Sequence, residues 1–592
     1  MTNTPGELAA PNTGAKMVEV GLGPLLTMMA RAFRASAQFY VLLTLGGATL
    51  FVVGATAYGQ IQLNAWNKPF YDALARKDFN GFIEQLLVFL VIAAGLLSLN
   101  VAQMWLNQMI KLKLREGLLH DLVDQWLEPR RAFRLAGEGE IGINPDQRIH
   151  EDARHLTELS TDLGIGLFQA SLLLISFIGV LWYLSTTVTF TFNGAAFSIP
   201  GYMVWCALLY AAIGSGLSWL VGRPLIHLNA ERYAREADLR SGLVRVHEHT
   251  DSIVLYGGEA DEKRHLSGSI GNVLDAMRRL VTGLTRLTWI TSGYGWLAIV
   301  APFLAASPGY FGGDLTFGEL MVAAGAFTQV QQSLRWFVDN FNTIADWLAT
   351  LRRVGSFRLA LVEMDNQVDE VGLIERYDAT DGKITFDDLS ITSATVSGRL
   401  AETHAEIAAG ERVLVTGASR LGLTLLFRAA AGLWMEGDGR IGLPFSEGVM
   451  FLPQRPYIQQ GALRDVLSYP PAANAFRDEE LIAALDSVGL ARLSSEVDRN
   501  ARWDNELSDD EAQRVAFARL LLHKPRWVCV DRALDALSEA DRRKVVKIFD
   551  NKLVGAAVVT FGDTDMCAGF STRTLHFISA PEQAPDRSAN PK

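Results

Sequence analysis

Residues 412–431, RVLVTGASRLGLTLLFRAAA, form the segment from which the architecture of the C-terminal third of the chain can be read. A short strand, Arg412 to Val415, leads into a loop with glycines at positions 417 and 422, and an apolar helical segment follows over 425–433. A buried strand, a glycine-rich loop and a helix in this order begin an α/β domain with a parallel sheet. We therefore predict alternating strands and helices over residues 383–580.

The loop has the glycine spacing of a phosphate-binding loop. Such a loop cradles phosphates with backbone N–H groups, carries a Lys that reaches the β- and γ-phosphates, and ends in a Ser or Thr that binds magnesium. Gly417, Gly422 and Thr424 occupy the expected positions, but Leu423 stands in the lysine position. Arg420 stands where a further glycine is usual. The loop therefore keeps two glycines and the hydroxyl but lacks its cation.

Three downstream segments resemble the other motifs of ABC-transporter nucleotide-binding domains. They are FLPQRPY (451–457), LSDDEAQR (507–514) and VCVDRALDALSEADRRK (528–544). The resemblance makes Gln454 the glutamine that links the metal site to a membrane domain, and it implies ATP and magnesium as ligands. The retained positions of this nucleotide site are Gly417, Gly422, Thr424, Gln454 and Asp531, of which Thr424 and Asp531 are the magnesium ligands.

Four catalytic elements of that family are replaced in this chain. The lysine is Leu423, the signature glycine is Asp510, the catalytic glutamate is Arg532 and the switch histidine is Asp563. ATP hydrolysis depends on positioning and on stabilising negative charge. A carboxylate that faces a phosphate at about 4 Å costs about 4 kcal/mol at an effective dielectric constant of about 20. We therefore expect a pseudo-ATPase, and the substitutions argue against ATP and magnesium as working cofactors.

The substituted positions carry charges of both signs. Arg532 and Arg420 add positive charge where nucleotide and metal would lie, whereas Asp510 and Asp563 add negative charge. Ion pairs within the chain or across a dimer could fill the site. Neutral drift after a loss of function is the alternative, and the sequence leaves both open.

The first 350 residues contain six apolar runs long enough to cross about 30 Å of hydrocarbon. The runs lie near residues 38–60, 83–106, 163–185, 199–221, 286–306 and 316–338. Lys and Arg concentrate in the connections 107–162 and 222–285, whereas the loops 186–198 and 307–315 have none. By the positive-inside rule both termini and both long connections are cytoplasmic, with the basic loop 61–82 as a mild exception. The connections are expected to extend the membrane helices.

Three strings in this membrane region narrow the resemblance. They are NPDQRIHED (144–152), NAWN followed by FYDAL (64–67 and 70–74), and IVLYGGE (253–259). Together they resemble the SbmA/BacA-like peptide-uptake permeases and their ATPase-fused bacterial relatives, with more distant kinship to peroxisomal fatty-acyl ABC transporters. The resemblance covers residues 30–580.

This resemblance implies a multidomain fold. An all-α, six-helix membrane domain with the type IV ABC exporter fold is followed by an α/β ABC domain of the P-loop NTPase type. It further implies a homodimer of half-transporters in the bacterial inner membrane that imports peptides or other bulky hydrophilic compounds. Because members without an ATPase domain use the proton gradient, proton coupling is the expected energy source.

The expected domain limits follow from these segments. They are an N-terminal cytoplasmic segment (1–30), the membrane domain (31–355), a linker (356–382), the degenerate ABC domain (383–580) and a disordered tail (581–592). Residues of the two long connections are expected to couple the membrane and cytoplasmic domains. The coupling residues are Asn144, Asp146, Arg148, Glu151, Tyr256, Gly257, Gly258 and Glu259.

The last membrane helix presents polar residues at helical spacing. Thr328, Gln332, Arg335 and Asp339 lie on one face, and ionisable groups at membrane depth usually face a water-filled path. They are candidates for the transport pathway, and an ordinary salt bridge in a cytoplasmic extension is the alternative. The cluster Asn64, Trp66 and Asn67 is open between a pathway role and interfacial anchoring.

Composition excludes several other classes. The net charge of −11 argues against a nucleic-acid partner. Cys206, Cys529 and Cys567 have no metal or disulfide spacing and are expected to pack in apolar surroundings. The first 30 residues lack the pattern of a signal peptide.

Two further functions stay open. The chain could bind ATP in a heterodimer with an active half-transporter, or it could be a non-transporting membrane scaffold or regulator. The sequence does not specify the substrate, the direction of transport or the coupling ion.

Overall fold

The computed structural model describes residues 21–136, 144–192, 195–363, 374–393, 395–445, 448–471, 475–535, 537–563 and 570–579. Parts of the expected N-terminal segment, linker and tail (1–20, 364–373 and 580–592) and Cys567 lie outside these residues. The chain divides into two compact units. One, the helical unit, comprises Glu19–Gln125 and Asn144–Leu359, and the other, the sheet unit, contains Trp126–Ile143 and the residues from Ala360 onward.

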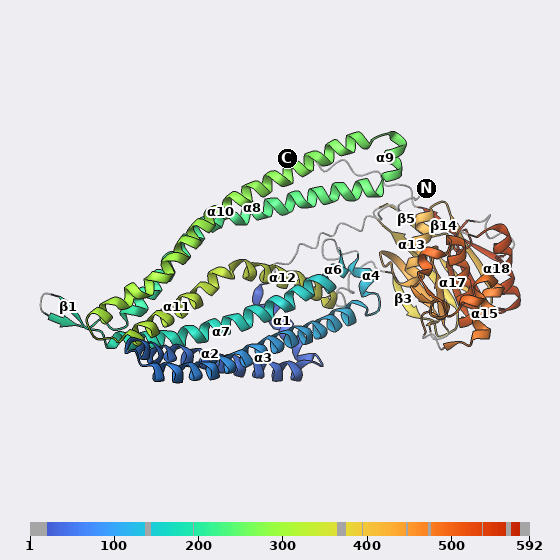
Figure 1. Ribbon diagram of the computed structural model, residues 1–592. Helices are drawn as coiled ribbons and strands as arrows, with labels where there is room; N and C mark the ends of the chain where they lie inside the picture. The colour runs from blue at the N-terminus through green and yellow to red at the C-terminus, as the bar shows by residue number, and fades with distance from the viewer. Residues whose placement is uncertain are drawn as a thin grey trace, which may run out of the picture. The chain divides into compact units, whose positions relative to one another are not determined.

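Long helices make up the helical unit (Figure 1). They are α1 (Leu22–Ala35), α2 (Phe39–Ala75), α3 (Phe79–Trp126), α6 (Pro145–Gln147), α7 (Ala153–Thr186), α8 (Tyr202–Glu248), α9 (Thr250–Tyr256), α10 (Glu259–Phe311), α11 (Phe317–Asp339) and α12 (Phe341–Glu363), with the π-helical turn η1 (Arg148–Asp152). The prediction that the long connections continue the membrane helices is confirmed, because α3, α8 and α10 each run on through residues that carry the Lys and Arg.

Five helices of the described residues are long and apolar enough to span a membrane. They are α2, α3, the α6–α7 segment, α8 and α10. The sixth expected span is a helix, α11, but it does not meet the same criterion. Its sequence contains Gln329, Gln331 and Gln332, which lower its hydropathy below that of the other five. Gln331 is buried, so part of this polarity faces other helices and not lipid.

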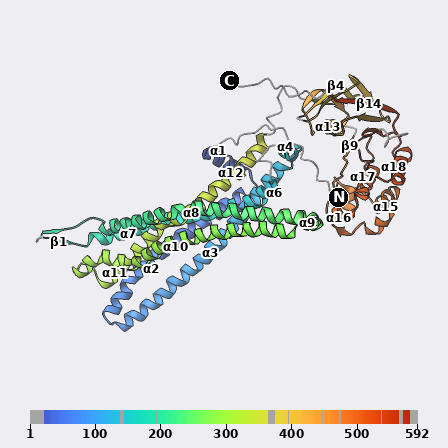
Figure 2. The same cartoon turned by 90° about the horizontal axis from the view of Figure 1, so that it is seen from above.

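The helices α8 and α10 run side by side along much of their length and are joined by α9, as two perpendicular views show (Figures 1 and 2). The short β1–β2 hairpin, β1 (Phe190–Phe192) and β2 (Ala195–Phe197), lies at the opposite end of the helical unit from α9. Gly257 ends α9 in the left-handed region at φ +64°. Its N–H donates to the Val254 carbonyl and the Gly258 N–H to the Ile253 carbonyl, which is a Schellman cap.

The sheet unit is built on a ten-stranded sheet. The strand order is β3-β8-β4-β5-β14-β7-β13-β12-β9, and β6 pairs with β4. The strands β14, β7, β13, β12 and β9 are parallel neighbours, whereas β4, β5 and β6 pair antiparallel. The strands are β3 (Glu375–Asp378), β4 (Ile384–Thr392), β5 (Ser397–Leu400), β6 (His404–Ile407), β7 (Arg412–Gly417), β8 (Gly437–Leu443), β9 (Val449–Leu452), β12 (Trp527–Asp531), β13 (Ala557–Phe561) and β14 (Arg573–Ser579), with a separate pair β10 (Gly461–Ala462) and β11 (Asn500–Ala501).

Helices cover this sheet and enclose two apolar cores. They are α4 (Arg131–Leu135), α13 (Arg420–Ala431), α14 (Leu463–Ser468), α15 (Asp478–Ser487), η4 (Ala491–Glu496), α16 (Trp503–Glu506), α17 (Asp509–His523) and α18 (Glu539–Asn551). All five residues of β12 are buried: Val528 and Val530 pack into one core, Trp527 and Cys529 into the other. A strand buried on both faces needs a continuous apolar run, which β12 has.

Candidate nucleotide site

The nucleotide-site motifs of the sheet unit meet at the carboxyl-end edge of its parallel strands. β7, β13, β12 and β9 are neighbours, and their carboxyl ends lead respectively to the glycine loop, Asp563, Arg532 and Gln454. Ligands of open α/β sheets bind at this edge. The structure therefore brings together the residues that the sequence assigned to the nucleotide site.

Arg532 occupies the centre of this site. Its Nη2 donates hydrogen bonds to Thr424 Oγ1 at 3.0 Å and to Gln454 Oε1 at 3.1 Å. Its Nε lies 3.5 Å from Asp531 Oδ1. The hydroxyl, amide and carboxylate oxygens that would face a magnesium ion in this family therefore face a guanidinium group instead.

Magnesium does not fit the site as it stands. The ion requires close to ideal octahedral oxygen coordination at about 2.0–2.1 Å, and the Arg532 guanidinium lies against Thr424, one candidate ligand, and near Asp531, the other. The side chain is 15% exposed, so the guanidinium is mostly shielded from water. That ATP and magnesium are not working cofactors stays a prediction.

The backbone of Arg532 is held in an unusual conformation. Its φ is +46°, in the left-handed region that non-glycine residues seldom adopt. The Arg532 N–H donates to the Phe561 carbonyl at 3.0 Å, and its carbonyl accepts from Asp535 N–H at 3.1 Å. These bonds to β13 and to the following turn fix the backbone position from which the Arg532 side chain extends. Strain of this kind persists where surrounding contacts over-determine it.

Burial dominates the electrostatics of Asp531. Its side chain is buried, and the loss of solvation raises the pKa of this carboxyl above its ordinary value, although the Arg532 guanidinium acts in the opposite direction. Burial likewise raises the pKa of Asp535 in the turn after Arg532. The cation in the site therefore offsets only part of the desolvation of Asp531.

The phosphate-binding loop is wound into helix. We predicted a loop up to Thr424 and a helix over 425–433, but α13 begins at Arg420, so that prediction of the boundary is wrong. Ser419 caps the helix by accepting from the Gly422 N–H at 3.1 Å, and the Leu423 N–H donates to the Ser419 carbonyl at 3.1 Å. Arg420 in place of a glycine favours helix, whereas Leu423 and lysine have similar helix propensities. The Gly422 and Leu423 amides are therefore both hydrogen-bonded to Ser419.

The glycine positions now have a packing role. A Cβ at Gly422 would lie 2.3 Å from the Phe577 ring, and one at Gly417 would lie 2.4 Å from the Phe577 carbonyl oxygen. Leu423 is fully buried in the core beside the sheet. The retained glycines and the lost lysine thus both serve close contact between α13 and the sheet.

The two acidic substitutions find partners within the chain. Arg420 Nη2 donates to Asp563 Oδ2 at 3.0 Å, and both side chains are largely exposed. Asp510 in the first turn of α17 pairs with Arg514 one turn later. Arg514 is a residue that the sequence analysis did not single out, and the i,i+4 spacing from Asp510 was the available signal.

The NPDQR string forms a helix start with a buried ion cluster. Asn144 adopts φ +55° ahead of Pro145, and η1 follows. Asp152, 4% exposed, accepts from Arg148 at 2.9 Å and from Arg353 of α12 at 3.0 Å. Asp152 and Arg353 were missed as site residues, since only the fold brings α12 to η1.

The other coupling candidates lie at the surface of the helical unit. Asp146 and Glu151 are exposed, and Glu151 pairs with Arg154 at 2.6 Å. Tyr256 is 90% exposed and Glu259 lies in the first turn of α10. Within the described residues of the helical unit, no contact links these side chains to another part of the chain, so their coupling role stays a prediction.

The pathway candidates lie on α11 as expected from their spacing. Arg335 Nε donates to Asp339 Oδ1 at 3.2 Å, Thr328 bonds the Ala324 carbonyl of its own helix, and Gln332 is exposed. Their role in transport is not tested by these contacts.

The NAWN cluster has structural partners instead. The buried Asn64 donates to the Val322 carbonyl of α11 at 3.2 Å, and the Trp66 indole donates to the Gln85 carbonyl of α3 at 2.8 Å. These two side chains tie α2 to its neighbours.

Comparison with known proteins identifies the membrane region. Residues 33–311 match the family model of ABC transporter transmembrane region 2. The chain is 27% identical to the inner membrane ABC transporter ATP-binding protein YddA of Escherichia coli over 84% of this chain and 88% of that protein. It is 23% identical to the human lysosomal cobalamin transporter ABCD4 over 86% of each chain.

A solved structure supports the fold. A bacterial Atm1-family ABC exporter with ATP bound superposes with a TM-score of 0.68 at 16% identity, covering 91% of this chain and 94% of that one. The predicted exporter fold, helical membrane domain followed by an α/β ABC domain, is therefore confirmed. Over most of its length the chain is thus similar to proteins in which one polypeptide fuses an ABC transporter transmembrane region to an ATP-binding domain.

Proposed function

We propose that this chain is a half-transporter that works as a homodimer in the bacterial inner membrane and does not hydrolyse ATP. The observation that carries the proposal is Arg532, whose guanidinium bridges Thr424 and Gln454 beside Asp531. A cation that belongs to the chain takes the place of the cation that would arrive with the nucleotide.

The energetics favour this closed site over a nucleotide complex. Hydrogen bonds to a charged group contribute about 1.5–3 kcal/mol each, and the bonds of Arg532 would have to break before magnesium could enter. The Gly422 and Leu423 amides would also have to leave Ser419, and no lysine would reach the phosphates. Micromolar binding is worth about 8 kcal/mol, so these costs together remove most of it.

The cargo that we propose is a peptide or another bulky hydrophilic compound, imported with protons. The resemblance of the NPDQR and LYGGE strings to peptide-uptake permeases supports this class, as does the similarity to a lysosomal transporter of cobalamin, a bulky hydrophilic molecule. Thr328, Gln332, Arg335 and Asp339 are the residues we propose for the pathway, with both termini in the cytoplasm.

The test uses the purified full chain in proteoliposomes. We expect no vanadate-sensitive ATP turnover at millimolar Mg·ATP, together with uptake of labelled peptides or cobalamin when a pH gradient is imposed. A protonophore should abolish that uptake, and Arg335→Gln should reduce it, whereas Arg264→Gln on the exposed surface of α10 should not. Vanadate-sensitive turnover by the wild-type chain would contradict the proposal, as would uptake that requires ATP.

A further inference from the structure

The first helix of the structure, α1, has two cavities on different faces. One, of about 530 Å³, is lined from α1 by Pro24, Thr27, Met28, Arg31 and Ala35. The other, of about 410 Å³, is lined from α1 by Leu26, Met29, Ala30, Phe33 and Arg34, with residues of α3, α7 and α12 opposite. Leu25 seats the helix between them, because it packs on Gly355 so closely that a Cβ there would lie 2.8 Å from its side chain.

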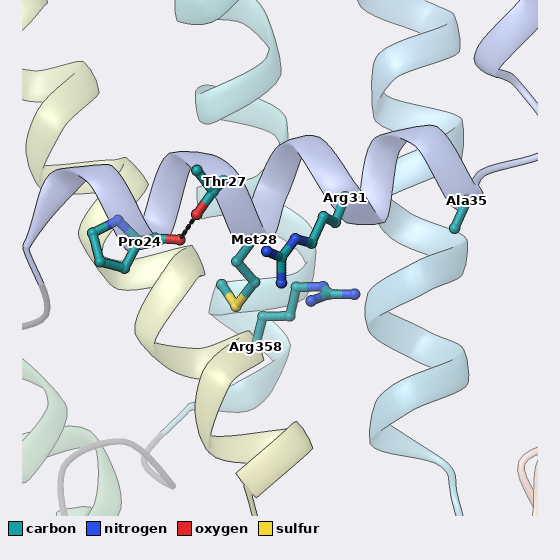
Figure 3. A pocket seen from close by; sticks show the side chains of 6 residues that line it. All are labelled: Pro24, Thr27, Met28, Arg31, Ala35 and Arg358. Carbon is teal, nitrogen blue, oxygen red and sulfur yellow. Dashed lines mark hydrogen bonds between the residues drawn. The ribbon is translucent and has the colours of Figure 1, made fainter.

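The first cavity gathers positive charge. Arg31 of α1 and Arg358 of α12 both line it, and Figure 3 shows both guanidinium groups on the same side of α1, near Met28. Asp121 of α3 accepts from Arg358 at 2.6 and 3.0 Å through Nε and Nη2, which leaves Nη1 available. Within the described part of the chain, the Arg31 side chain makes no ion pair or hydrogen bond. The cavity therefore has a net charge of one positive unit.

The second cavity is mainly apolar, although Arg34 of α1 also lines it. Its wall includes Leu114, Leu118, Leu156 and Leu351, and Asp121, the partner of Arg358, also lines it. The Asp121–Arg358 ion pair thus connects the charged cavity with the apolar one. A ligand that matches both would carry one negative charge and a hydrocarbon chain.

The height of the two cavities along the helices indicates the source of such a ligand. They lie beside the start of α2 at Phe39 and beside Leu114 and Leu118 of α3, just past the point where Lys111 and Lys113 end the apolar part of that helix. This is the level of a membrane–water interface. The helix α1 turns apolar residues toward the bundle and leaves Arg31 and Arg34 exposed, as interfacial helices do.

We propose that α1, α3 and α12 form a binding site for an anionic phospholipid. The phosphodiester lies between Arg31 and Arg358, and an acyl chain enters the cavity beneath Met29 and Phe33. A singly charged phosphate neutralises the excess charge of the three ionic groups, and two guanidinium groups are suited to phosphate oxygens. The site is independent of the proposed transport function.

The test measures lipid binding by the full chain in a non-ionic detergent, with native mass spectrometry as the readout. Phosphatidylglycerol is expected to bind, and phosphatidylcholine, whose headgroup has no net charge, is expected to bind much more weakly. Arg31→Gln should weaken phosphatidylglycerol binding by about five- to tenfold, since one basic residue at a membrane surface is worth about 1 kcal/mol or more. Arg286→Gln, which removes an exposed arginine of α10, should leave it unchanged.

Two further arms separate the sources of binding. Ala30→Phe, which fills part of the apolar cavity, should lower the affinity for phosphatidylglycerol and leave any binding of inorganic phosphate unaltered. The proposal is overturned if inorganic phosphate binds as tightly as the lipid, if phosphatidylcholine binds as well as phosphatidylglycerol, or if Arg31→Gln and Arg286→Gln behave alike.

Discussion

Two buried aspartates, Asp152 in the helical unit and Asp531 in the sheet unit, differ in how closely arginines pair with them. Asp152 is held by Arg148 and by Arg353, with distances of 2.9–3.1 Å for the best bonds. Asp531 is 3.5 Å from the nearest nitrogen of Arg532, whose best bonds go to Thr424 and Gln454.

The difference in these distances reflects the different roles of the two carboxylates. Asp152 joins η1 to α12 in a complete ion cluster that belongs to the fold. Asp531 stands where a metal ligand stands in related ATPases, and the arginine beside it fits the oxygens around it better than it fits the carboxylate. The aspartate that joins two helices is thus fully paired, whereas the aspartate of the candidate nucleotide site lies farther from its neighbouring arginine.

The largest effect is expected at the complete cluster. Asp152→Asn leaves two arginines without their anion, and breaking a buried ion cluster from one side costs about 3 kcal/mol or more. The thermal midpoint of the detergent-solubilised protein should fall well below that of Asp251→Asn, a control on the exposed surface of α9. Equal midpoints for the two variants would remove the distinction between the aspartates.

Removal of Arg532 should have a smaller effect that depends on pH. Arg532→Gln loses two charge-assisted hydrogen bonds and should cost about 2 kcal/mol. It also removes a cation that lowers the pKa of Asp531, so this already raised pKa should rise further. A carboxyl with a raised folded-state pKa destabilises the fold as pH rises from its unfolded pKa through its folded pKa, and the effect is complete above that window.

The direction of this pH effect on stability can be measured by thermal unfolding. The difference in thermal midpoint between wild type and Arg532→Gln should be larger at about pH 8 than at about pH 5, while Arg543→Gln, at an exposed position of α18, should show little change at either pH. A difference that grows toward acid pH would contradict the assignment.

Added magnesium should stabilise a variant with a carboxylate at position 532 but not the wild-type chain. Arg532→Glu removes the guanidinium and adds a carboxylate next to Asp531, Thr424 and Gln454, which are oxygen ligands of the kind that magnesium prefers. Millimolar magnesium should then raise the stability of the variant by about 1 kcal/mol and leave the wild type unchanged. Equal responses to magnesium would show that Arg532 does not occupy the metal position.

The smallest effect is expected for the exposed pair. Arg420→Gln breaks the ion pair with Asp563, but exposed pairs contribute about 0–1 kcal/mol. Its thermal midpoint should stay close to that of the wild type and should move less than that of Arg532→Gln. A larger loss would mean that the pair closes the site.

Much of the fold was predictable because long patterns average over many residues. The apolar runs, the strand of β12 and the β7–α13 unit each extend over several residues that agree with one another. The start of α13 was not predictable from the glycine spacing, because the helix is capped by Ser419 and begins at Arg420, where the motif usually has a glycine. The polarity of α11 likewise departs from the pattern because Gln331 is satisfied against neighbouring helices.

The site could be predicted only in part. The motifs placed Arg532 beside Thr424, Gln454 and Asp531, since these residues lie at the ends of adjacent parallel strands or in the loop or helix that follows them. It did not indicate which oxygens the guanidinium would choose, because that choice depends on the φ of +46° and on the bond to Phe561. The partners of Asp152 required the packing of α12 on η1.

The most direct test of the account is equilibrium binding of ATP to the full chain in lipid nanodiscs, with and without magnesium. We predict no saturable binding up to millimolar ATP and no effect of magnesium, because Arg532 occupies the metal position and Leu423 replaces the lysine that would reach the phosphates. Saturable binding that depends on magnesium would contradict the central claim that this chain has closed its own nucleotide site.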